Sequence, residues 1–296
     1  MNQITVIGDV NVDIVSLLRE PLQLNSDTRT SNSLNLGGSP CNMAMWLAHL
    51  GAPVNFIAAV GDDLLGEWIK GQMLAGNLSV NELQTISASP SGTCLILVNA
   101  DGHRTMLPDP GANLSLQLSE TQIELIKNSA VVVMSAYTYL RPETQPIANQ
   151  VLEIVEQSPT RLVLDAASAA PIANTGVELV RRYLQQADLV LANEDEFELL
   201  KGSNWTQSVN NLIVKLGANG AIWLINGEPN CTVSANEVNV IDTTGAGDSF
   251  LAGLVSVLAD HEDWFAMDDQ DRESALKHAV ATAEKNIAKV GAGPRK

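Results

Sequence analysis

The sequence predicts an α/β fold, with a doubly wound, mostly parallel sheet covered by helices and a second, small sheet beside it. Short apolar runs separated by helix-length stretches indicate alternating strands and helices, the pattern of a sheet buried on both faces. The length of 296 residues allows one large α/β domain with a substantial core. Two strand-like segments, roughly residues 12–36 and 92–113, interrupt this alternation and are expected to form the small sheet.

Composition and charge exclude several classes of protein. Hydrophobic residues make up 45% and charged residues 17%, as in a globular protein rather than a disordered one. The net charge of −17 argues against nucleic acid and against an anionic membrane surface as partners. No apolar run approaches the roughly 18 residues of a membrane span, and the N-terminus lacks the pattern of a signal peptide. Three widely spaced cysteines without a C-x-x-C pair argue against zinc or dithiol chemistry and fit a reducing cytoplasm.

The N-terminal part contains the first strand, half of the small sheet and a helix. Ile4–Ile7 is a short apolar run and is expected to be a buried strand. The segment 12–36 is polar with alternating stretches, which indicates two short strands and turns. Gly37 and Gly38 end it, and the stretch Asn42–Leu50 places its apolar side chains on one helical face.

The rest of the chain continues the alternation. Asp101-Gly102 is a favourable hairpin turn between two strand-like runs of the small sheet. Further helices are expected at Pro146–Gln157, at Val177–Gln186 and from Gly245 onward. The remaining expected strands are Val54–Val60, Thr93–Val98, Arg104–Leu107, Val131–Met134, Leu162–Leu164, Leu189–Leu191, Leu212–Lys215, Ala221–Ile225 and Val238–Ile241.

The segment Asp242–Phe250 (DTTGAGDSF) carries the strongest chemical signal. It follows the strand-like run Val238–Ile241 and opens an amphipathic helix. The small residues Gly245–Gly247 leave backbone N–H groups unobstructed, and a helix N-terminus adds partial positive charge, so the segment predicts an anion hole. Asp248 stands at the helix start, where a carboxylate can face a hydroxyl nucleophile. Taken alone, an aspartate that caps a glycine-rich turn would have the same pattern.

This nine-residue string resembles the signature of the ribokinase-like carbohydrate kinases, also called the phosphofructokinase B family. The sequence has neither a P-loop pattern nor a G-x-G-x-x-G after its first strand, which disfavours P-loop NTPases and dinucleotide-binding proteins. The resemblance runs from Gly8 to Gly293 and implies one ribokinase-like kinase domain, residues 1–296, with a β lid from about 12–36 and 92–113. It implies catalytic roles for Gly245, Ala246, Gly247 and the general base Asp248.

The residues that resemble the family's sugar site lie toward the N-terminus. The string Gly37–Asn42 (GGSPCN) matches the family's first signature, in which glycines let the backbone approach a small ligand and the Asn amide offers donors and an acceptor. Asn11 and Asp13 alternate with apolar residues, so both face one side of an extended segment and suit neighbouring sugar hydroxyls; a polar strand end facing water is the alternative. The resemblance implies substrate contacts from Asn11, Asp13, Gly37, Gly38, Asn42, Asn113 and Asp248.

The nucleotide end is expected in the C-terminal half. Asn193 and Glu196 lie on one helical face and resemble the family's N-x-x-E motif, in which the Glu holds the water shell of Mg²⁺; a capped acidic helix start has the same composition. The segment Lys215–Gly220 resembles a loop that passes under the phosphates of ATP, and a plain β-turn is the alternative. The resemblance implies nucleotide contacts from Asn193, Glu196, Lys215, Gly217, Gly220, Thr244, Gly245, Gly247 and His278.

Related enzymes often bind a monovalent cation such as K⁺ between two segments that match Asp242–Thr244 and residues 290–295 of this chain. The resemblance makes Asp242 and Thr244 candidate ligands. Arg295 stands where the family usually has a small polar residue, so the sequence leaves activation by a cation open.

The resemblance implies an ATP-dependent sugar kinase that uses Mg²⁺. Ser39-Pro40 after the glycine pair is typical of fructokinases rather than ribokinases, so a hexose such as fructose is expected first, although the arginine that some fructokinases have after Asp165 is absent. A ribose or nucleoside kinase, or a non-catalytic sugar sensor, remains an alternative. The expected partners are the sugar, ATP and a second copy of the chain paired through the lid strand Thr93–Val98, and the expected compartment is the cytoplasm.

Overall fold

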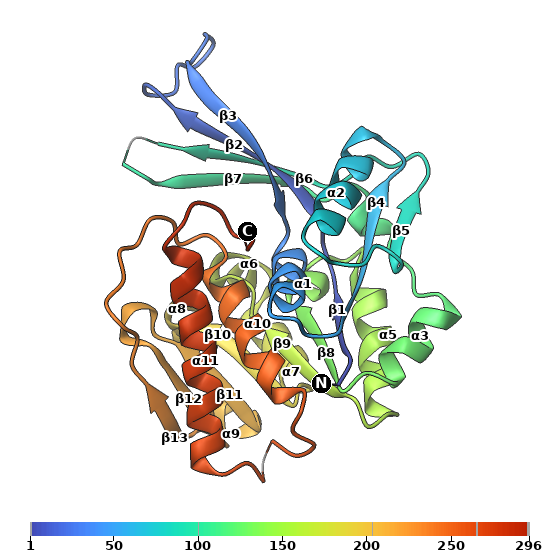
Figure 1. Ribbon diagram of the computed structural model, residues 1–296, viewed down its shortest axis with the longest axis vertical. Helices are drawn as coiled ribbons and strands as arrows, with labels where there is room; N and C mark the ends of the chain where they lie inside the picture. Colours follow the sequence, from blue (N-terminus) through green and yellow to red (C-terminus); the bar gives the residue numbers. More distant parts are fainter. Residues whose placement is uncertain (1, 100, 203, 265, 295–296) are drawn as a thin grey trace.

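The computed structural model describes residues 2–99, 101–202, 204–264 and 266–294, and consists of a large sheet flanked by helices and a small sheet beside it (Figure 1). The large sheet has the strand order β13-β12-β11-β10-β9-β8-β1-β4-β5. Neighbouring strands are parallel from β11 through β5, whereas β12 and β13 run antiparallel to their neighbours. Its strands are β1 (Ile4–Ile7), β4 (Val54–Gly61), β5 (Leu83–Ile86), β8 (Val131–Ser135), β9 (Arg161–Asp165), β10 (Leu189–Asn193), β11 (Asn211–Lys215), β12 (Ala221–Ile225) and β13 (Glu228–Val233).

Helices cover both faces of the large sheet, which confirms the predicted fold class. On one face lie α1 (Ser39–His49), α2 (Leu64–Ala75), α10 (Ala246–Leu258) and α11 (Asp269–Ile287). On the other lie α3 (Glu120–Lys127), α4 (Tyr137–Leu140), α5 (Gln145–Glu156), α6 (Ala169–Thr175), α7 (Val177–Leu184), α8 (Glu194–Leu200) and α9 (Trp205–Ser208). Two 3-10 turns are η1 (Gly111–Ser115) and η2 (Gly217–Asn219). None of the helices in the described parts of the chain combines the length and the apolar character needed to cross a bilayer.

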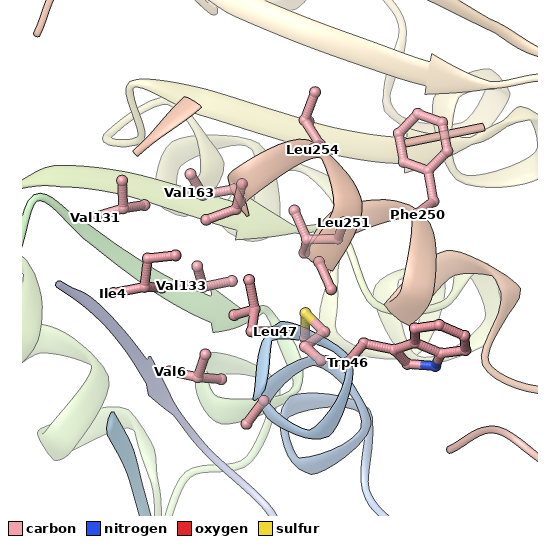
Figure 2. Close-up of a cluster of buried hydrophobic side chains, with 14 of the residues drawn as sticks. Ile4, Val6, Trp46, Leu47, Val131, Val133, Val163, Phe250, Leu251 and Leu254 are labelled. Carbon is pink, nitrogen blue, oxygen red and sulfur yellow. The ribbon is translucent and has the colours of Figure 1, made fainter. Parts of the chain in front are cut away.

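The central strands are buried on both faces, which explains why they read as continuous apolar runs. Alternate side chains enter different core layers, because successive residues of a strand point to opposite faces. Ile4 and Val6 of β1 pack in the layer under α1 and α10, and Ile7 packs in the opposite layer. Figure 2 shows the first layer, where the β1 and β8 side chains lie opposite Leu47 of α1 and Leu251 of α10.

The small sheet has the order β3-β2-β6-β7 and forms the lid. Its strands are β2 (Asn11–Leu18), β3 (Thr30–Gly37), β6 (Thr93–Val98) and β7 (Arg104–Asp109). β2 pairs with β6 in parallel, and the two remaining pairs are antiparallel. Both strand-bearing segments expected from the sequence are therefore confirmed, as is the β6–β7 hairpin.

The register assigns the lid side chains to two faces. Asp13 is opposite Cys94 on β6, and Val98, four residues further along β6, is opposite Arg104, so Asp13 and Arg104 share one face. The other face carries an apolar row across the strands, formed by Leu34, Ile14, Leu95 and Leu107. Because β6 lies between β2 and β7, both of its edges are occupied, so a second copy cannot add a strand to Thr93–Val98, and a dimer through the lid stays a prediction.

Two differences from the sequence-based expectation have physical reasons. Val238–Ile241 is not a strand: the Ile241 N–H donates to the carbonyl of Ile287 at 2.8 Å, so this segment follows the end of α11 rather than a sheet edge. The outer strands β5 and β13 are not anticipated by the sequence pattern. β13 (EPNCTV) contains a proline and mostly exposed side chains, which a sheet tolerates only at its edge.

Candidate active site

Five of the nine predicted nucleotide-binding residues line a cavity of about 950 Å³ beyond the carboxyl ends of β10 and β11. Its wall includes Asn193, Lys215, Gly217, Gly220, Ala246 and Gly247. A second cavity, of about 920 Å³, lies at the opposite end of the sheet beside Gln3, Ala130 and Asp188, and its described lining contains none of the predicted site residues. Ligands of open α/β sheets bind beyond the carboxyl ends of the strands. The first cavity is therefore the candidate nucleotide site.

The helix α10 begins at the anion hole predicted from the sequence. Gly245 caps this helix with a φ of 75°, and a Cβ there would lie 2.6 Å from a side chain of the C-terminal segment, so glycine is required. The Ala246 N–H donates to the carbonyl of Thr243 at 3.2 Å. The N–H groups of Gly247 and Asp248 lie in the first turn, where the helix offers them no acceptor, so they are left to bind an anion.

Asp248 is half-buried between α1 and α10, and both of its carboxylate oxygens are held by α1. Ser39 Oγ donates to Oδ1 at 2.7 Å, and Asn42 Nδ2 donates to Oδ2 at 2.8 Å. Burial raises the pKa of Asp248 to about 6, while these two hydrogen bonds act in the opposite direction. The group is therefore oriented and titrates near neutral pH, which suits a general base.

Asp13 lies at the predicted sugar end, close enough to Asp248 for the charge of Asp248 to affect it. A Cβ on Gly37 would lie 2.2 Å from the Asp13 carboxyl carbon, so only glycine leaves room there, and the neighbouring Gly38 has a φ of 94°. Burial, together with the negative charge of Asp248, raises the pKa of Asp13 to about 7. Burial and both carboxylates also raise the pKa of Cys41. The two acids therefore border the same space.

Asn113 holds the base of the lid. Its Oδ1 accepts the Val10 N–H at 3.0 Å, and its Nδ2 lies within hydrogen-bond distance of the carbonyls of Val10 and Pro110 and of Oδ1 of Asn11. The amide group of Asn113 is therefore engaged with the protein on both sides. It orients Asn11, and a direct contact of Asn113 with a sugar stays a prediction.

Lys215 lies where the cavity meets α10. Its Nζ is 2.9 Å from Oδ2 of Asp165, and a Cβ on Gly247 would lie 3.2 Å from the same Nζ. Although burial acts to lower it, the charges of Asp165 and Glu196 hold the pKa of Lys215 above its usual value. Lys215 is therefore charged, and it stands beside the anion hole, where a phosphoryl group would need positive charge.

Glu196 is 2% exposed and forms a reciprocal cap with Asn193. Its oxygens accept the backbone N–H of Asn193 at 2.8 Å and the side-chain Nδ2 at 2.6 Å, and the Glu196 N–H donates to Asn193 Oδ1 at 2.9 Å. Burial and the charge of Asp165 raise the pKa of Glu196 to about 7. The capped acidic helix start is thus present, and it holds this carboxylate in one orientation near Lys215.

The structure does not bring His278 to the cavity. The side chain of His278 is largely exposed on α11. Partial burial and the positive charge of Lys285 lower its pKa. The residues of α11 that line the cavity are Val280, Ala283, Glu284 and Ile287. Gly217 and Gly220, by contrast, line the cavity and have φ values of 54° and 93°, which favour glycine.

Some residues of the site were not assigned a role from the sequence. Asp165 ends the buried strand β9, and a carboxylate at the carboxyl edge of a parallel sheet is a signal that could have been used. Burial raises the pKa of Tyr137 of α4, and the negative charges of Asp165 and Asp248 act in the same direction. Arg104 reaches Asp242 from the lid, and nothing in the sequence around Arg104 predicts this contact.

Comparison with known proteins identifies the family. A family model described as "pfkB family carbohydrate kinase" matches residues 1–295. The chain belongs to this family. The resemblance read from the sequence is thereby confirmed, and this carbohydrate kinase is a phosphotransferase with an alcohol group as acceptor.

Named relatives of this kinase differ in their acceptors. It is 24% identical over 273 residues to fructokinase-2 of Solanum habrochaites, an alignment that covers 87% of this chain and 83% of the relative. Its fold is similar to the crystal structure of an adenosine kinase from Sinorhizobium meliloti, with a TM-score of 0.84 and 20% identity over 99% of this chain and 96% of that one. A fructokinase with bound ATP from Xylella fastidiosa also gives a TM-score of 0.84, with 18% identity over 98% and 93% of the two chains. The shared fold therefore does not discriminate between these acceptors.

The raised pKa of Asp13 predicts a pH-dependent gain of stability on Asp13→Asn. The folded protein binds the Asp13 proton with a pKa of about 7, above the ordinary 3.8, so the folded state holds more protons than the unfolded state between these values. This group therefore makes the free energy of unfolding fall as pH rises. The stability advantage of the variant over the wild type should grow by about 2 kcal/mol between roughly pH 5.5 and pH 8.5, measured by urea unfolding.

Asp27→Asn is the matched control, because Asp27 is an exposed carboxylate of the β2–β3 connection in the same lid. It should leave the free energy of unfolding within about 0.5 kcal/mol of the wild type at both pH values. An Asp13→Asn variant with the same pH dependence as the wild type would show that the pKa of Asp13 is not raised in the folded protein.

Proposed function

We propose that this kinase transfers the γ-phosphoryl group of ATP to a hydroxyl of a small sugar, with Asp248 as the general base. The observation that carries the proposal is the position of Asp248. Its carboxylate is held by Ser39 and Asn42 on the sugar side and belongs to the first turn of α10, whose N–H groups form the anion hole. The proposed proton acceptor, the Asp248 carboxylate, and the N–H groups of Gly247 and Asp248 that would bind the phosphoryl group therefore belong to the same turn of α10.

The groups of this site account for the chemistry. Asp248 accepts the proton of the attacking hydroxyl, which then attacks the phosphorus in line with the departing ADP oxygen. The N–H groups of Gly247 and Asp248 and the ammonium of Lys215 stabilise the charge that develops on the phosphoryl oxygens. The cavity beside Gly217 and Gly220 accepts the nucleotide.

Mg²⁺ fits the carboxylates at the phosphate end through water. Both oxygens of Glu196 already accept hydrogen bonds from Asn193, and in the described parts of the chain no group of three or more His, Cys, Asp or Glu side chains is arranged to hold a metal by itself. Glu196, with Asp165 nearby, would therefore orient the water shell of an ion carried by the ATP phosphates. When bound, Mg²⁺ neutralises phosphate charge.

For the acceptor, we propose a hexose, with fructose first. Ser39 and Pro40 follow the glycine pair, and Ser39 turns its hydroxyl to Asp248. The pocket between Asp13 and Asp248 therefore contains no long side chain from this position. Asn11 and Asp13 then supply donors and acceptors for neighbouring ring hydroxyls.

Ribose and nucleosides are the competing acceptors, and a non-catalytic sugar sensor is the competing role. The likeness in fold to adenosine kinase keeps a nucleoside in the comparison. A sensor is disfavoured because a carboxylate with a raised pKa, such as Asp248, makes the folded protein less stable at neutral pH and is not required for binding alone.

For the quaternary structure, we propose a homodimer through the lid face opposite Asp13 and Arg104. That face presents the apolar row, of which Leu34, Leu95 and Leu107 are exposed. Contact through this face replaces the edge-on pairing that β6 cannot make.

Asp248→Asn should abolish turnover while leaving the Kd values for ATP and sugar within about threefold of the wild type. Loss of a general base lowers kcat by roughly 10²–10⁴-fold, because the hydroxyl must then lose its proton to water. A coupled assay of ADP release gives kcat, and calorimetric titration gives the Kd values. Asp62→Asn, an exposed aspartate of a surface turn, serves as control and should keep full activity. Turnover in Asp248→Asn close to that of the wild type would contradict the proposed role.

The acceptor is tested by kcat/KM for fructose, ribose and adenosine under the same conditions. We expect fructose to exceed adenosine by roughly tenfold or more, because the site has polar groups for sugar hydroxyls. A tenfold preference for adenosine would overturn the sugar assignment. A preference for ribose would overturn only the argument from Ser39 and Pro40.

A further inference from the structure

Arg104 connects the lid to the segment that leads into the anion hole. It begins β7 on the lid face that also carries Asp13. Its guanidinium donates to Oδ1 of Asp242 and to Oγ1 of Thr244, more than a hundred residues further along the chain. Figure 1 shows the β6–β7 hairpin above the loops near the C-terminus. Arg104 therefore bridges the lid and the segment that leads into α10.

Asp242 pairs with Arg104 and accepts hydrogen bonds on both of its carboxylate oxygens. Oδ1 accepts the N–H and the hydroxyl of Thr244, at 2.8 and 2.6 Å, in addition to Arg104, and Oδ2 accepts the Gly291 N–H at 2.9 Å. Although burial opposes ionisation, these hydrogen bonds lower the pKa of Asp242 to about 2. Three of these four donors reach Oδ1, which has about two lone pairs, so Oδ1 is saturated, whereas Oδ2 has one donor.

Several oxygens of the residues that the resemblance makes cation ligands are thus already engaged. Besides Oδ1 of Asp242, the carbonyl of Thr244 accepts Nδ2 of Asn286 at 2.7 Å. Among the buried side-chain oxygens of the described residues, Oδ1 of Asn286 has no hydrogen-bond partner. Arg295, the residue that departs from the family pattern, lies outside the described residues. With Arg104 in this position, Asp242 already has beside it the positive charge that a K⁺ ion would supply.

We propose that the guanidinium of Arg104 takes the place of the monovalent cation, and that Arg104 is a positioning residue for the anion hole. Its charge neutralises Asp242. Two N–H groups of the planar guanidinium hold Asp242 and Thr244 in place directly before Gly245, where α10 begins. The proposal rests on the proposed function of this anion hole. It makes phosphoryl transfer independent of K⁺, with the required charge delivered by the lid.

The first test needs no substitution. Turnover and the thermal midpoint of the wild type are measured in potassium chloride and in choline chloride at equal ionic strength. Both should agree between the two salts, with turnover within about twofold. A selective rise of either quantity in K⁺ would overturn the proposal, because it would show that a cation enters while Arg104 is present.

The second test compares Arg104→Ala, Arg104→Lys and the lid control Arg29→Ala. Arg29 makes an exposed ion pair with Glu20, so its removal should change nothing measurable. Arg104→Ala should lower kcat roughly ten- to a hundredfold while the sugar KM stays within about threefold, because the anion hole is misplaced and the sugar contacts are not. K⁺ should then raise both its kcat and its thermal midpoint. Arg104→Lys should keep part of the activity without responding to K⁺, since lysine retains the positive charge but cannot donate the two hydrogen bonds of the planar guanidinium.

The outcomes separate this proposal from the proposed function. An Arg104→Ala variant with unchanged kcat, with a raised sugar KM alone, or without any response to K⁺ would overturn the role of Arg104. The comparison of thermal midpoints does not require turnover, so it remains informative even if Asp248→Asn shows that the proposed base is wrong.

Discussion

The pair of hydrogen bonds from α1 to Asp248 is the interaction on which the site depends. Ser39 and Asn42 lie more than two hundred residues from Asp248 in the chain, and their contacts join the sugar end to the first turn of α10. A second link holds the same helix in place, because Trp46 Nε1 donates to the carbonyl of Ala292, the residue that packs against Gly245. The proposed base Asp248, the anion hole and the glycine pair Gly37-Gly38 are therefore held in a fixed arrangement.

The charge in this site makes the folded protein less stable. The pKa values of Asp13, Asp248 and Glu196 are raised to about 7, 6 and 7, so each ionised group destabilises the folded state at neutral pH. In a chain with a net charge of −17, Lys215 from β11 offsets part of this charge at Asp248 and Glu196, and Arg104 from the lid pairs with Asp242. Perturbed carboxylates combined with placed cations are typical of functional sites.

The sequence predicted the parts of the fold and site that have a local signal. Runs such as Val131–Met134 are buried on both faces and read directly as parallel strands, and the glycine-rich start of α10 is visible as a string. Contacts across the fold have no such signal: Arg104 meets Asp242 because the lid folds over the loop. The apolar run Val238–Ile241 was misassigned as a strand, because its side chains have the composition of a strand but its backbone pairs with the end of a helix.

The central proposal is that Asp248 is the base and that hydrogen bonds from α1 limit the rise of its pKa on burial. The direct measurement is the pH dependence of kcat/KM for the wild type and for Ser39→Ala. In the wild type, the part of the acid limb that belongs to Asp248 should lie near pH 6, below the parts that belong to Asp13 and Glu196, since Asp248 becomes protonated there. Removing the Ser39 hydrogen bond should move this acid limb upward by roughly one pH unit, because a bond to the ionised carboxylate is lost. An acid limb at the same pH in both proteins would contradict the account.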